Sequence, residues 1–304
     1  MPKIIAAVLA VVTLVSAAAA QPAADRVEIH HIHGLAIDSH DAGVVYVATH
    51  TGLARLKSGA APAWVGAQRF DFMGFTTHPS TAGVMFASGH PDVPTYQRDK
   101  VGNLGLLVSR DGGRAWQSVA LRGEADFHAM TYSPRDGGRL FGWSVAGERG
   151  LYRISTATWK AERLTAAGLD NVISLAASPD PRGPLLAGTA SGLRVSRDGG
   201  ATWTAAAGLP AGSPVTAVAY HPTDTERVYA YVHKAGGGLH RSEDGGRTWK
   251  ATGFTAGPET PVVALAAGHA DDVAMATSAA DVARSGDGGS TWIALVTRGR
   301  AVTR

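Results

Sequence analysis

The 304-residue sequence predicts an all-β fold, a six-bladed β-propeller, on the strength of two observations. The first is a repeat of roughly 45 residues, a period typical of propeller blades built from four short strands. The repeat is marked by six tryptophans, namely Trp64, Trp116, Trp159, Trp203, Trp249 and Trp292. The second observation is the pattern Ser-x-Asp-Gly-Gly-x-x-Trp, which begins at Ser109, Ser196, Ser242 and Ser285. A turn motif at a fixed place in successive units indicates that the units share one structure.

The first residues have the features of a secretory signal peptide rather than of the fold. Lys3 precedes an apolar run over residues 4–15, and small residues follow up to Ala20. We expect cleavage after Ala20 and export to the periplasm or out of the cell. The apolar run is short for a membrane span, so we expect none in the mature chain. Residues 21–304 are then predicted to form one propeller domain.

Four strand-like segments follow one another in each repeat. In the second repeat the first segment is DFMGFTTHP, starting at Asp71, and the second is VMFASGH, ending at His90. The third opens at a Gly-Leu pair, and the fourth carries the tryptophan. Residues 26–29 precede the first repeat and alternate polar with apolar residues. We expect them to pair with the last blade and close the ring, because an open ring exposes two sheet edges.

The Ser-x-Asp-Gly-Gly-x-x-Trp pattern is predicted to be a structural turn between the third and fourth strands. The serine and aspartate side chains can hydrogen-bond the turn backbone, and the glycine pair supplies positive φ angles. The tryptophan is expected to pack against the blade. The first repeat lacks the Asp-Gly-Gly core between residues 58 and 64, and the third has a shortened turn between residues 155 and 159.

Composition narrows the function classes. The chain has no cysteine, which excludes disulfides, thiolate ligands and a cysteine nucleophile. Its formal net charge is +3, but only 17% of its residues are charged and the basic ones are scattered. We therefore expect no nucleic-acid partner. We also expect the exported protein to be a monomer.

Potential ligand side chains gather in the first three repeats. Aligning the repeats places His31, Asp71, Asp126 and Asn171 at one ring position and His33, Met73 and His128 two residues further on. His50, His90 and His233 share the position at the end of the second strands. Because these strand ends meet at one mouth of the central channel, we expect His33, His50, His90 and His128 to converge there. The predicted metal-binding set is His31, His33, His50, His90, His128, Asp71, Asp126 and Met73.

The residue types suggest which metal would bind. Imidazole with carboxylate suits zinc, and imidazole with thioether suits copper. The sequence therefore predicts binding of a copper or zinc ion, or of another small ligand, at this mouth.

The four full motifs resemble those of the Asp-box, or bacterial neuraminidase repeat, superfamily. It includes sialidases, sortilin-type receptors and photosystem II assembly factors. The segments HIHGLAID, VYVATHTGL, DFMGF, SGHPD, NLGL and DFHAM are similar to exported bacterial Asp-box propellers often labelled glycosylhydrolases. This resemblance implies a propeller from about residue 30 to about residue 300, and it says little about activity.

Two further functions stay open on this resemblance. Asp71 and Asp126 are candidates for the carboxylate pair of a glycoside hydrolase. A sialidase is not expected, because no arginine stands at the start of any first strand to bind a substrate carboxylate. The other alternative is a protein-binding propeller that acts as an assembly factor or chaperone for an exported partner.

Overall fold

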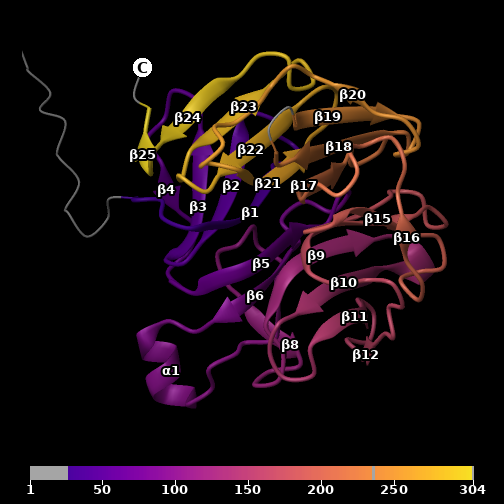
Figure 1. The fold of residues 1–304 in the computed structure, drawn as a ribbon. Helices are drawn as coiled ribbons and strands as arrows, with labels where there is room; N and C mark the ends of the chain where they lie inside the picture. The colour runs from indigo at the N-terminus through magenta and orange to yellow at the C-terminus, as the bar shows by residue number, and fades with distance from the viewer. Residues whose placement is uncertain (1–26, 235–236, 303–304) are drawn as a thin grey trace, which may run out of the picture.

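Six antiparallel sheets follow one another around a central axis, as drawn in Figure 1. The computed structural model describes residues 27–234 and 237–302. The predicted signal peptide and its cleavage site lie outside these residues. Each sheet is built from consecutive strands, so that the chain completes one blade before it starts the next. The predicted six-bladed propeller is confirmed.

The blades have the following strands. Blade one contains β1 (Ile32–Ile37), β2 (Val44–Thr49), β3 (Gly52–Lys57) and β4 (Ala63–Trp64). Blade two contains β5 (Asp71–Thr77), β6 (Met85–His90), β7 (Leu106–Ser109) and β8 (Gln117–Ala120). Blade three contains β9 (Phe127–Ser133), β10 (Arg139–Ser144), β11 (Gly150–Ser155) and β12 (Ala161–Arg163), with a 3-10 turn at Arg135–Gly137.

The second half of the ring continues the pattern. Blade four contains β13 (Val172–Ala177), β14 (Leu185–Thr189), β15 (Gly192–Ser196) and β16 (Thr204–Ala205). Blade five contains β17 (Val215–Tyr220), β18 (Arg227–Val232), β19 (Gly238–Glu243) and β20 (Lys250–Ala251). Blade six contains β21 (Val262–Ala267), β22 (Val273–Thr277), β23 (Val282–Ser285), β24 (Ile293–Thr297) and β25 (Arg300–Ala301).

The hydrophobic core is divided into six layers, each shared by two neighbouring blades. In β2, Val45 and Val47 pack against blade six, whereas Val44, Tyr46 and Ala48 pack against blade two. Successive side chains of a strand point to opposite faces, so a sheet packed on both faces buries every residue. All six residues of β2 are buried for this reason.

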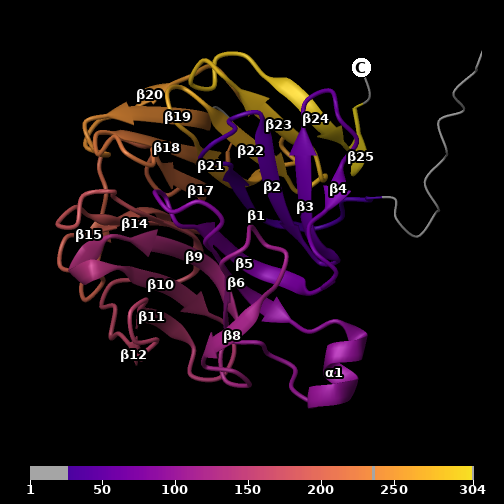
Figure 2. The ribbon, with the colours of Figure 1, turned by 180° about the vertical axis from the view of Figure 1, so that it is seen from behind.

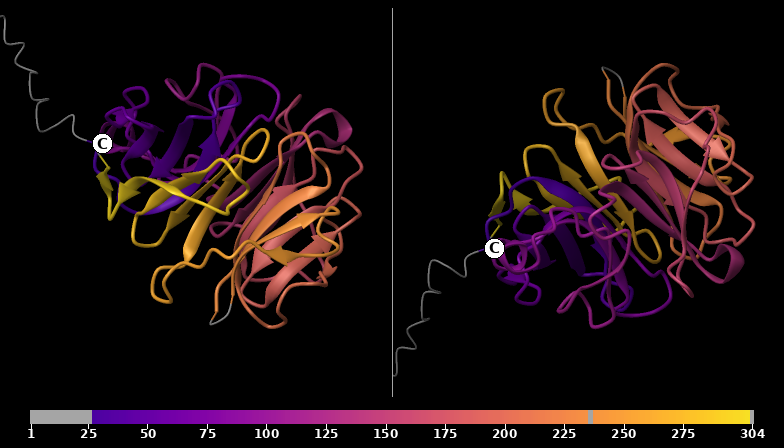
Figure 3. Two further views of the ribbon diagram at one scale, coloured as in Figure 1. Left: turned by 90° about the horizontal axis from the view of Figure 1, so that it is seen from above. Right: turned by 90° about the horizontal axis from the view of Figure 1, so that it is seen from below.

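The ring closes by packing of the first blade on the last. Strand β1 contacts both β5 and β21, and the indigo and yellow strands lie side by side from above and below (Figure 3). Residues 27–29, the described part of the segment expected to pair with the last blade, form no strand. The Ile29 N–H nevertheless donates to the Gly299 carbonyl, and Ile29 packs in the core layer that blades one and six share. The fifth strand of blade six, β25, comes instead from the C-terminal end of the chain.

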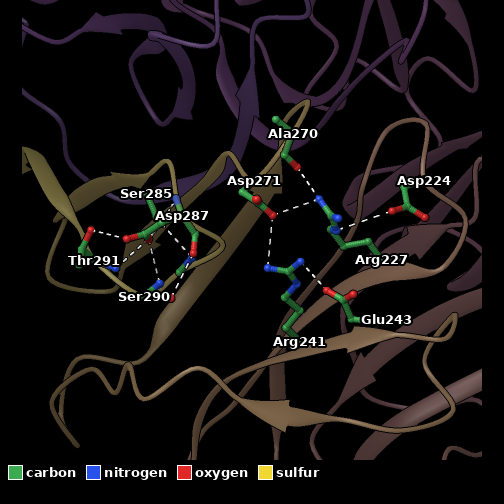
Figure 4. A network of polar contacts seen from close by, with 11 residues as sticks. Asp224, Arg227, Arg241, Glu243, Ala270, Asp271, Ser285, Asp287, Ser290 and Thr291 are labelled. Carbon is green, nitrogen blue, oxygen red and sulfur yellow. Dashed lines mark hydrogen bonds and ion pairs between the residues drawn. The ribbon is translucent and has the colours of Figure 1, made fainter.

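The repeated turn motif has the structural role expected of it, as the last copy shows in Figure 4. The Ser285 hydroxyl donates to Asp287 Oδ1 at 2.7 Å and accepts from the Gly289 N–H at 2.8 Å. Asp287 Oδ1 in turn accepts from the Thr291 N–H at 2.8 Å. Gly288 and Gly289 have φ angles of 71° and 90°, which an L side chain rarely adopts. The aspartate thus organises the turn that carries the chain from β23 to β24.

Ion pairs connect blade five to blade six beside that turn (Figure 4). Asp271 of blade six lies 3.1 Å from Arg227 and 3.3 Å from Arg241. Arg227 and Arg241 also pair with Asp224 and Glu243, respectively. These contacts reinforce an interface between blades that is otherwise held by apolar packing.

One short helix interrupts blade two. Helix α1 (Val93–Asp99) follows β6 and projects away from the body of the ring (Figure 1, Figure 2). The Asp92 side chain accepts a hydrogen bond from the Thr95 N–H and so caps the helix. In the described part of the chain, no helix has the length and hydropathy needed to cross a membrane.

A candidate metal centre at the channel mouth

A β-bulge at the start of every first strand shapes one mouth of the channel. In blade one, Ile32 pairs with Thr49 and Gly34 with Ala48, so His33 is the extra residue between two paired ones. The other five blades shift register at the equivalent place, and their extra residues are Met73, His128, Ile173, Thr216 and Val263. Three of these six, His33, Met73 and His128, are the residues that the repeat alignment places at one ring position. A bulge leaves its extra residue unpaired and re-aims its side chain, which is why bulges often lie next to functional sites.

The ends of the second strands supply two more histidines. His50 follows β2, where the Thr49 hydroxyl accepts from the Thr51 N–H and donates to the Gly52 carbonyl, which fixes the turn. His90 is the last residue of β6 and pairs directly with Asp71 at the start of β5. Cross-strand neighbours place their side chains within contact distance, and His90 Nδ1 lies 3.1 Å from Asp71 Oδ2.

His33, His50 and Asp71 form the first half of the cluster. One ligand atom from each lies within 4.8 Å of the other two. The His50 Nδ1 atom lies 3.2 Å from Asp71 Oδ1, across the boundary between blades one and two. The rings of His33 and His50 are 4.6 Å apart between centroids. His31 is adjacent, with its ring centroid 4.9 Å from that of His50.

His90, Asp126 and His128 form the second half. The His90 Nε2 atom lies 3.4 Å from Asp126 Oδ2, across the boundary between blades two and three. The same oxygen lies 2.9 Å from His128 Nε2. Asp126 is held in place because its N–H donates to the Ser144 hydroxyl and its carbonyl accepts from the Val145 N–H.

The two halves are joined through Asp71 and His90. Asp71 presents Oδ1 to His50 and Oδ2 to His90, and His90 presents its two nitrogens to two different carboxylates. The nitrogens of an imidazole ring point in divergent directions, so Asp71 and Asp126 lie on different sides of His90. A continuous chain of contacts thus links these residues across blades one to three, and the convergence of His33, His50, His90 and His128 on one ion stays a prediction. We call this chain the histidine–aspartate chain; it contains His31, His33, His50, Asp71, His90, Asp126 and His128.

Burial and neighbouring charges shift the pKa values of residues in the histidine–aspartate chain in different directions. Burial, and then the nearby His50, lower the pKa of His33 to about 4. Hydrogen bonds to Asp126 and Asp71 raise the pKa of His90 to about 10. Burial acts to raise the pKa of Asp126, but hydrogen bonds from His128 and His90 outweigh it and hold that pKa well below its usual value. Without a bound ligand, His90 is thus a cation between carboxylates, and His33 is neutral.

Within the histidine–aspartate chain, three polar atoms are buried without a hydrogen-bond partner among the described residues. They are His33 Nε2, Asp71 Oδ1 and Asp126 Oδ1. Asp71 Oδ1 is close to His50, but not in hydrogen-bonding geometry. A buried polar atom without a partner is costly, and such atoms often indicate a bound water or ion.

The remaining predicted positions contribute less. Met73 occupies the bulge of blade two, between the blades of His33 and His128, and is half-buried. Blades four to six present Ile173, Thr216 and Val263 at the same ring position, so their sector of the mouth holds no bulged histidine or carboxylate. The repeat alignment found the ligand-type side chains, but not the bulges or the role of Gly89 before His90. A Cβ atom on Gly89 would lie 1.9 Å from the Asp71 carbonyl oxygen. In the sequence, the glycine directly before His90 is the feature that could have indicated this close approach.

The other end of the channel has a different character. A cavity of about 190 Å³ opens there, lined mainly by apolar residues from the ends of the first strands. His78 and His221 lie at this end, and their Nδ1 atoms accept from the backbone N–H groups of Thr81 and Asp224. Both histidines cap turns. Because the third strands also end at this side, the Ser-Asp-Gly-Gly turns lie at the opposite end from the histidine–aspartate chain.

Comparison with known proteins agrees with the blade architecture. Residues 151–304 match the family described as Photosynthesis system II assembly factor YCF48. The chain belongs to this family. Among curated proteins, no sequence matches the chain significantly.

Several solved structures have the same fold as this protein. One is the GH74 xyloglucanase from Xanthomonas campestris, with a TM-score of 0.57 and 19% identity over 89% of this chain and 46% of that one. Another is the extracellular domain of a putative hybrid two-component system from B. thetaiotaomicron, with a TM-score of 0.55 and 13% identity over 90% of this chain and 35% of that one. The chain spans less than half the length of both. At these identities the likeness concerns the fold alone.

The family match and the histidine–aspartate chain occupy different parts of the ring. The match covers residues 151–304, whereas the chain of contacts uses residues 31–128. Membership of the assembly-factor family therefore explains the blades and their turns, and it leaves the chemistry of the mouth to be argued from its residues.

Proposed function

We propose that the protein binds a divalent transition-metal ion at the channel mouth through His33, His50 and Asp71, in the exported compartment. The observation that carries the proposal is the buried, unpartnered pair of atoms His33 Nε2 and Asp71 Oδ1 within this group. A metal ion would give both atoms a partner. Two neutral imidazoles and a carboxylate are also a common set of protein ligands for zinc and copper.

One separation within the group fits such an ion, and the three ligand atoms all lie within 4.8 Å of one another. Ligand atoms around a tetrahedral ion with bonds of 2.0–2.1 Å lie about 3.3 Å apart. The His50 Nδ1 to Asp71 Oδ1 distance of 3.2 Å has this value. His33 also has the required protonation state, because its lowered pKa keeps the imidazole neutral at ordinary pH. His31 lies beside the group, with its ring centroid 4.9 Å from that of His50.

The glycoside hydrolase alternative receives less support from the geometry. Its acid needs a raised pKa so that it can protonate the leaving group, and the pKa of Asp126 is lowered. Both carboxylates also face His90. A polypeptide partner is compatible with metal binding, because the family has an assembly role by name and Ile173 of blade four is exposed at the same mouth.

Metal titration of the purified, tag-free protein tests the proposal. We expect Cu²⁺ or Zn²⁺ to bind with measurable heat and to raise the melting temperature by mass action, and His33→Ala or His50→Ala to remove this binding. His40→Ala is the matched control, because His40 is an exposed histidine in the loop between β1 and β2 and should leave binding unchanged. Unaltered metal affinity in His33→Ala and in His50→Ala would rule out the site. The Cu²⁺ spectrum of wild type and of Met73→Leu shows whether the thioether takes part.

A further inference from the structure

The carboxylate of Asp71 is shared between two blades. Its Oδ1 atom lies 3.2 Å from His50 Nδ1 of blade one, and its Oδ2 atom lies 3.1 Å from Nδ1 of His90 in its own blade. The torsion that rotates an aspartate carboxylate has only broad preferences, so the backbone does not set it. The two oxygens of a carboxylate point in different directions, and a contact that fixes Oδ2 therefore also fixes the direction of Oδ1. The orientation of Asp71 Oδ1 thus depends on His90.

The imidazole ring of His90 is itself held from both sides. Its Nδ1 atom faces Asp71, and its Nε2 atom lies 3.4 Å from Asp126 Oδ2. The ring cannot turn without losing one of these contacts. Asp126 is only 5% exposed, and its backbone is tied to Ser144 and Val145 of blade three. Blade three therefore gives the His90 ring a fixed support.

The strands behind these side chains are also tied to each other. His90 and Asp71 are directly paired residues of β6 and β5. The Phe127 N–H donates to the hydroxyl of Ser88 at 3.0 Å, and Ser88 is completely buried. This hydrogen bond joins blades two and three next to His90 and Asp126 in the sequence. Side chains on such a frame are held precisely enough to orient a ligand.

We infer that His90 is a positioning residue of the proposed metal site: it holds Asp71 so that Oδ1 faces blade one, and it does not bind the ion. A hydrogen-bond partner of a ligating carboxylate typically contributes about 10–100-fold to metal affinity. The inference deepens the proposed function and rests on it, because Asp71 must be a ligand. Through Asp126, blade three then has a share in the site although it supplies no ligand.

The charge of His90 acts in the opposite direction. A ring with a carboxylate at each nitrogen carries a hydrogen on both and is a cation, which repels a metal ion. This repulsion acts whether or not Asp71 is present, whereas the orienting effect needs Asp71. Removal of His90 in the presence and in the absence of Asp71 therefore separates the two effects.

A double-mutant cycle tests the inference. We measure the Cu²⁺ affinity of the purified, tag-free protein by isothermal titration calorimetry for wild type, His90→Ala, Asp71→Ala and the double variant. We expect His90→Ala to lower the affinity about 10–100-fold in the wild-type background and not to lower it in the Asp71→Ala background. His40→Ala is again the control and should match wild type, and circular dichroism shows that each variant is folded.

A conservative variant tests the hydrogen bond itself. The side-chain amide of His90→Asn can place an N–H near the position of Nδ1, so this variant should recover part of the affinity that His90→Ala loses. A structural effect of removing the ring would not be reversed by so small a side chain. Equal affinities of His90→Asn and His90→Ala would contradict a hydrogen bond to Asp71 as the cause.

The remaining outcomes separate this inference from the proposed function. Equal losses on removal of His90 in both backgrounds would show that His90 does not act through Asp71 and would overturn the inference. An unchanged affinity of His90→Ala would overturn it as well. Both results leave the proposed function standing when Asp71→Ala itself binds Cu²⁺ more weakly than wild type. An unaltered affinity of Asp71→Ala would instead overturn the proposed ligand set.

Discussion

At the scale of single residues, the charge pattern of the mouth depends on Asp126. It is the most buried of the carboxylates there, and it faces the imidazoles of His90 and His128. These imidazoles hold its pKa low, and Asp126 in turn helps to raise the pKa of His90 to about 10. The protonated His90 is thus stabilised by the fold as long as both of its carboxylate partners are ionised.

Replacement of Asp126 by Asn should weaken the dependence of stability on alkaline pH. In the metal-free wild type, the folded-state pKa of His90 of about 10 lies above the unfolded value of 6.5. Its contribution to stability is fully present below pH 6.5 and is lost as the pH rises through about 10. Asp126→Asn removes the largest cause of the shift, so the variant should lose less stability over this range. Urea unfolding in EDTA at pH 6 and pH 10 measures the difference, and equal losses in the two proteins would contradict the assignment.

At the scale of elements, the site depends on how closely β5 and β6 approach. Gly89 has a φ angle of +147°, and its missing side chain leaves room for the Asp71 carbonyl. This close approach pairs Asp71 with His90 and brings the end of β6 to the mouth. The bulge at Met73 lies in the same strand pair, between Phe72 and Gly74. Local backbone geometry therefore decides which way the ligand side chains point.

Replacement of Gly89 by Ala should both destabilise the fold and disturb the mouth. The new Cβ would lie 1.9 Å from the Asp71 carbonyl oxygen, so the strands must separate. We expect a loss of about 2–3 kcal/mol in the free energy of unfolding from strain and overpacking, together with weaker metal binding. Gly59→Ala is the matched control: its φ is +75°, but no atom lies within 4 Å of its Cβ. Its loss should be about 1 kcal/mol, with unchanged metal affinity. Equal effects of the two variants in denaturant unfolding would show that the contact with Asp71 is unimportant.

At the scale of the whole molecule, the two ends of the channel have separate roles. The Ser-Asp-Gly-Gly turns and the 190 Å³ cavity lie at one end, and the histidine–aspartate chain lies at the other. The turns hold the outer strands of four blades, and the six shared core layers hold the blades together. Stability and binding should therefore respond to different substitutions.

Replacement of Asp198 by Ala should lower stability and leave metal binding intact. Asp198 accepts hydrogen bonds from the N–H groups of Ala201 and Thr202 and from the hydroxyls of Ser196 and Thr202. We expect a loss of about 1–2 kcal/mol in the free energy of unfolding at pH 7. The hydrogen bonds from Thr202 and its neighbours lower the pKa of Asp198 to about 2. Its contribution is therefore present above pH 4 and lost as the pH falls through about 2, where variant and wild type should become alike. A variant with wild-type melting temperature and lost metal binding would contradict this separation.

The sequence by itself determined the number of blades, the place of each strand and the sector of the ring that carries ligand-type side chains. It could do so because a repeat makes each unit a template for the next, and equivalent positions of a closed ring must lie at the same height. Only the tertiary structure decided that residues 27–29 join blade six by packing and one hydrogen bond rather than as a strand, and that His90 lies between Asp71 and Asp126. Those outcomes depend on the bulges, on the approach permitted by Gly89 and on distances across blade interfaces. Such distances arise from packing between residues far apart in the sequence, and no local pattern of residues encodes them.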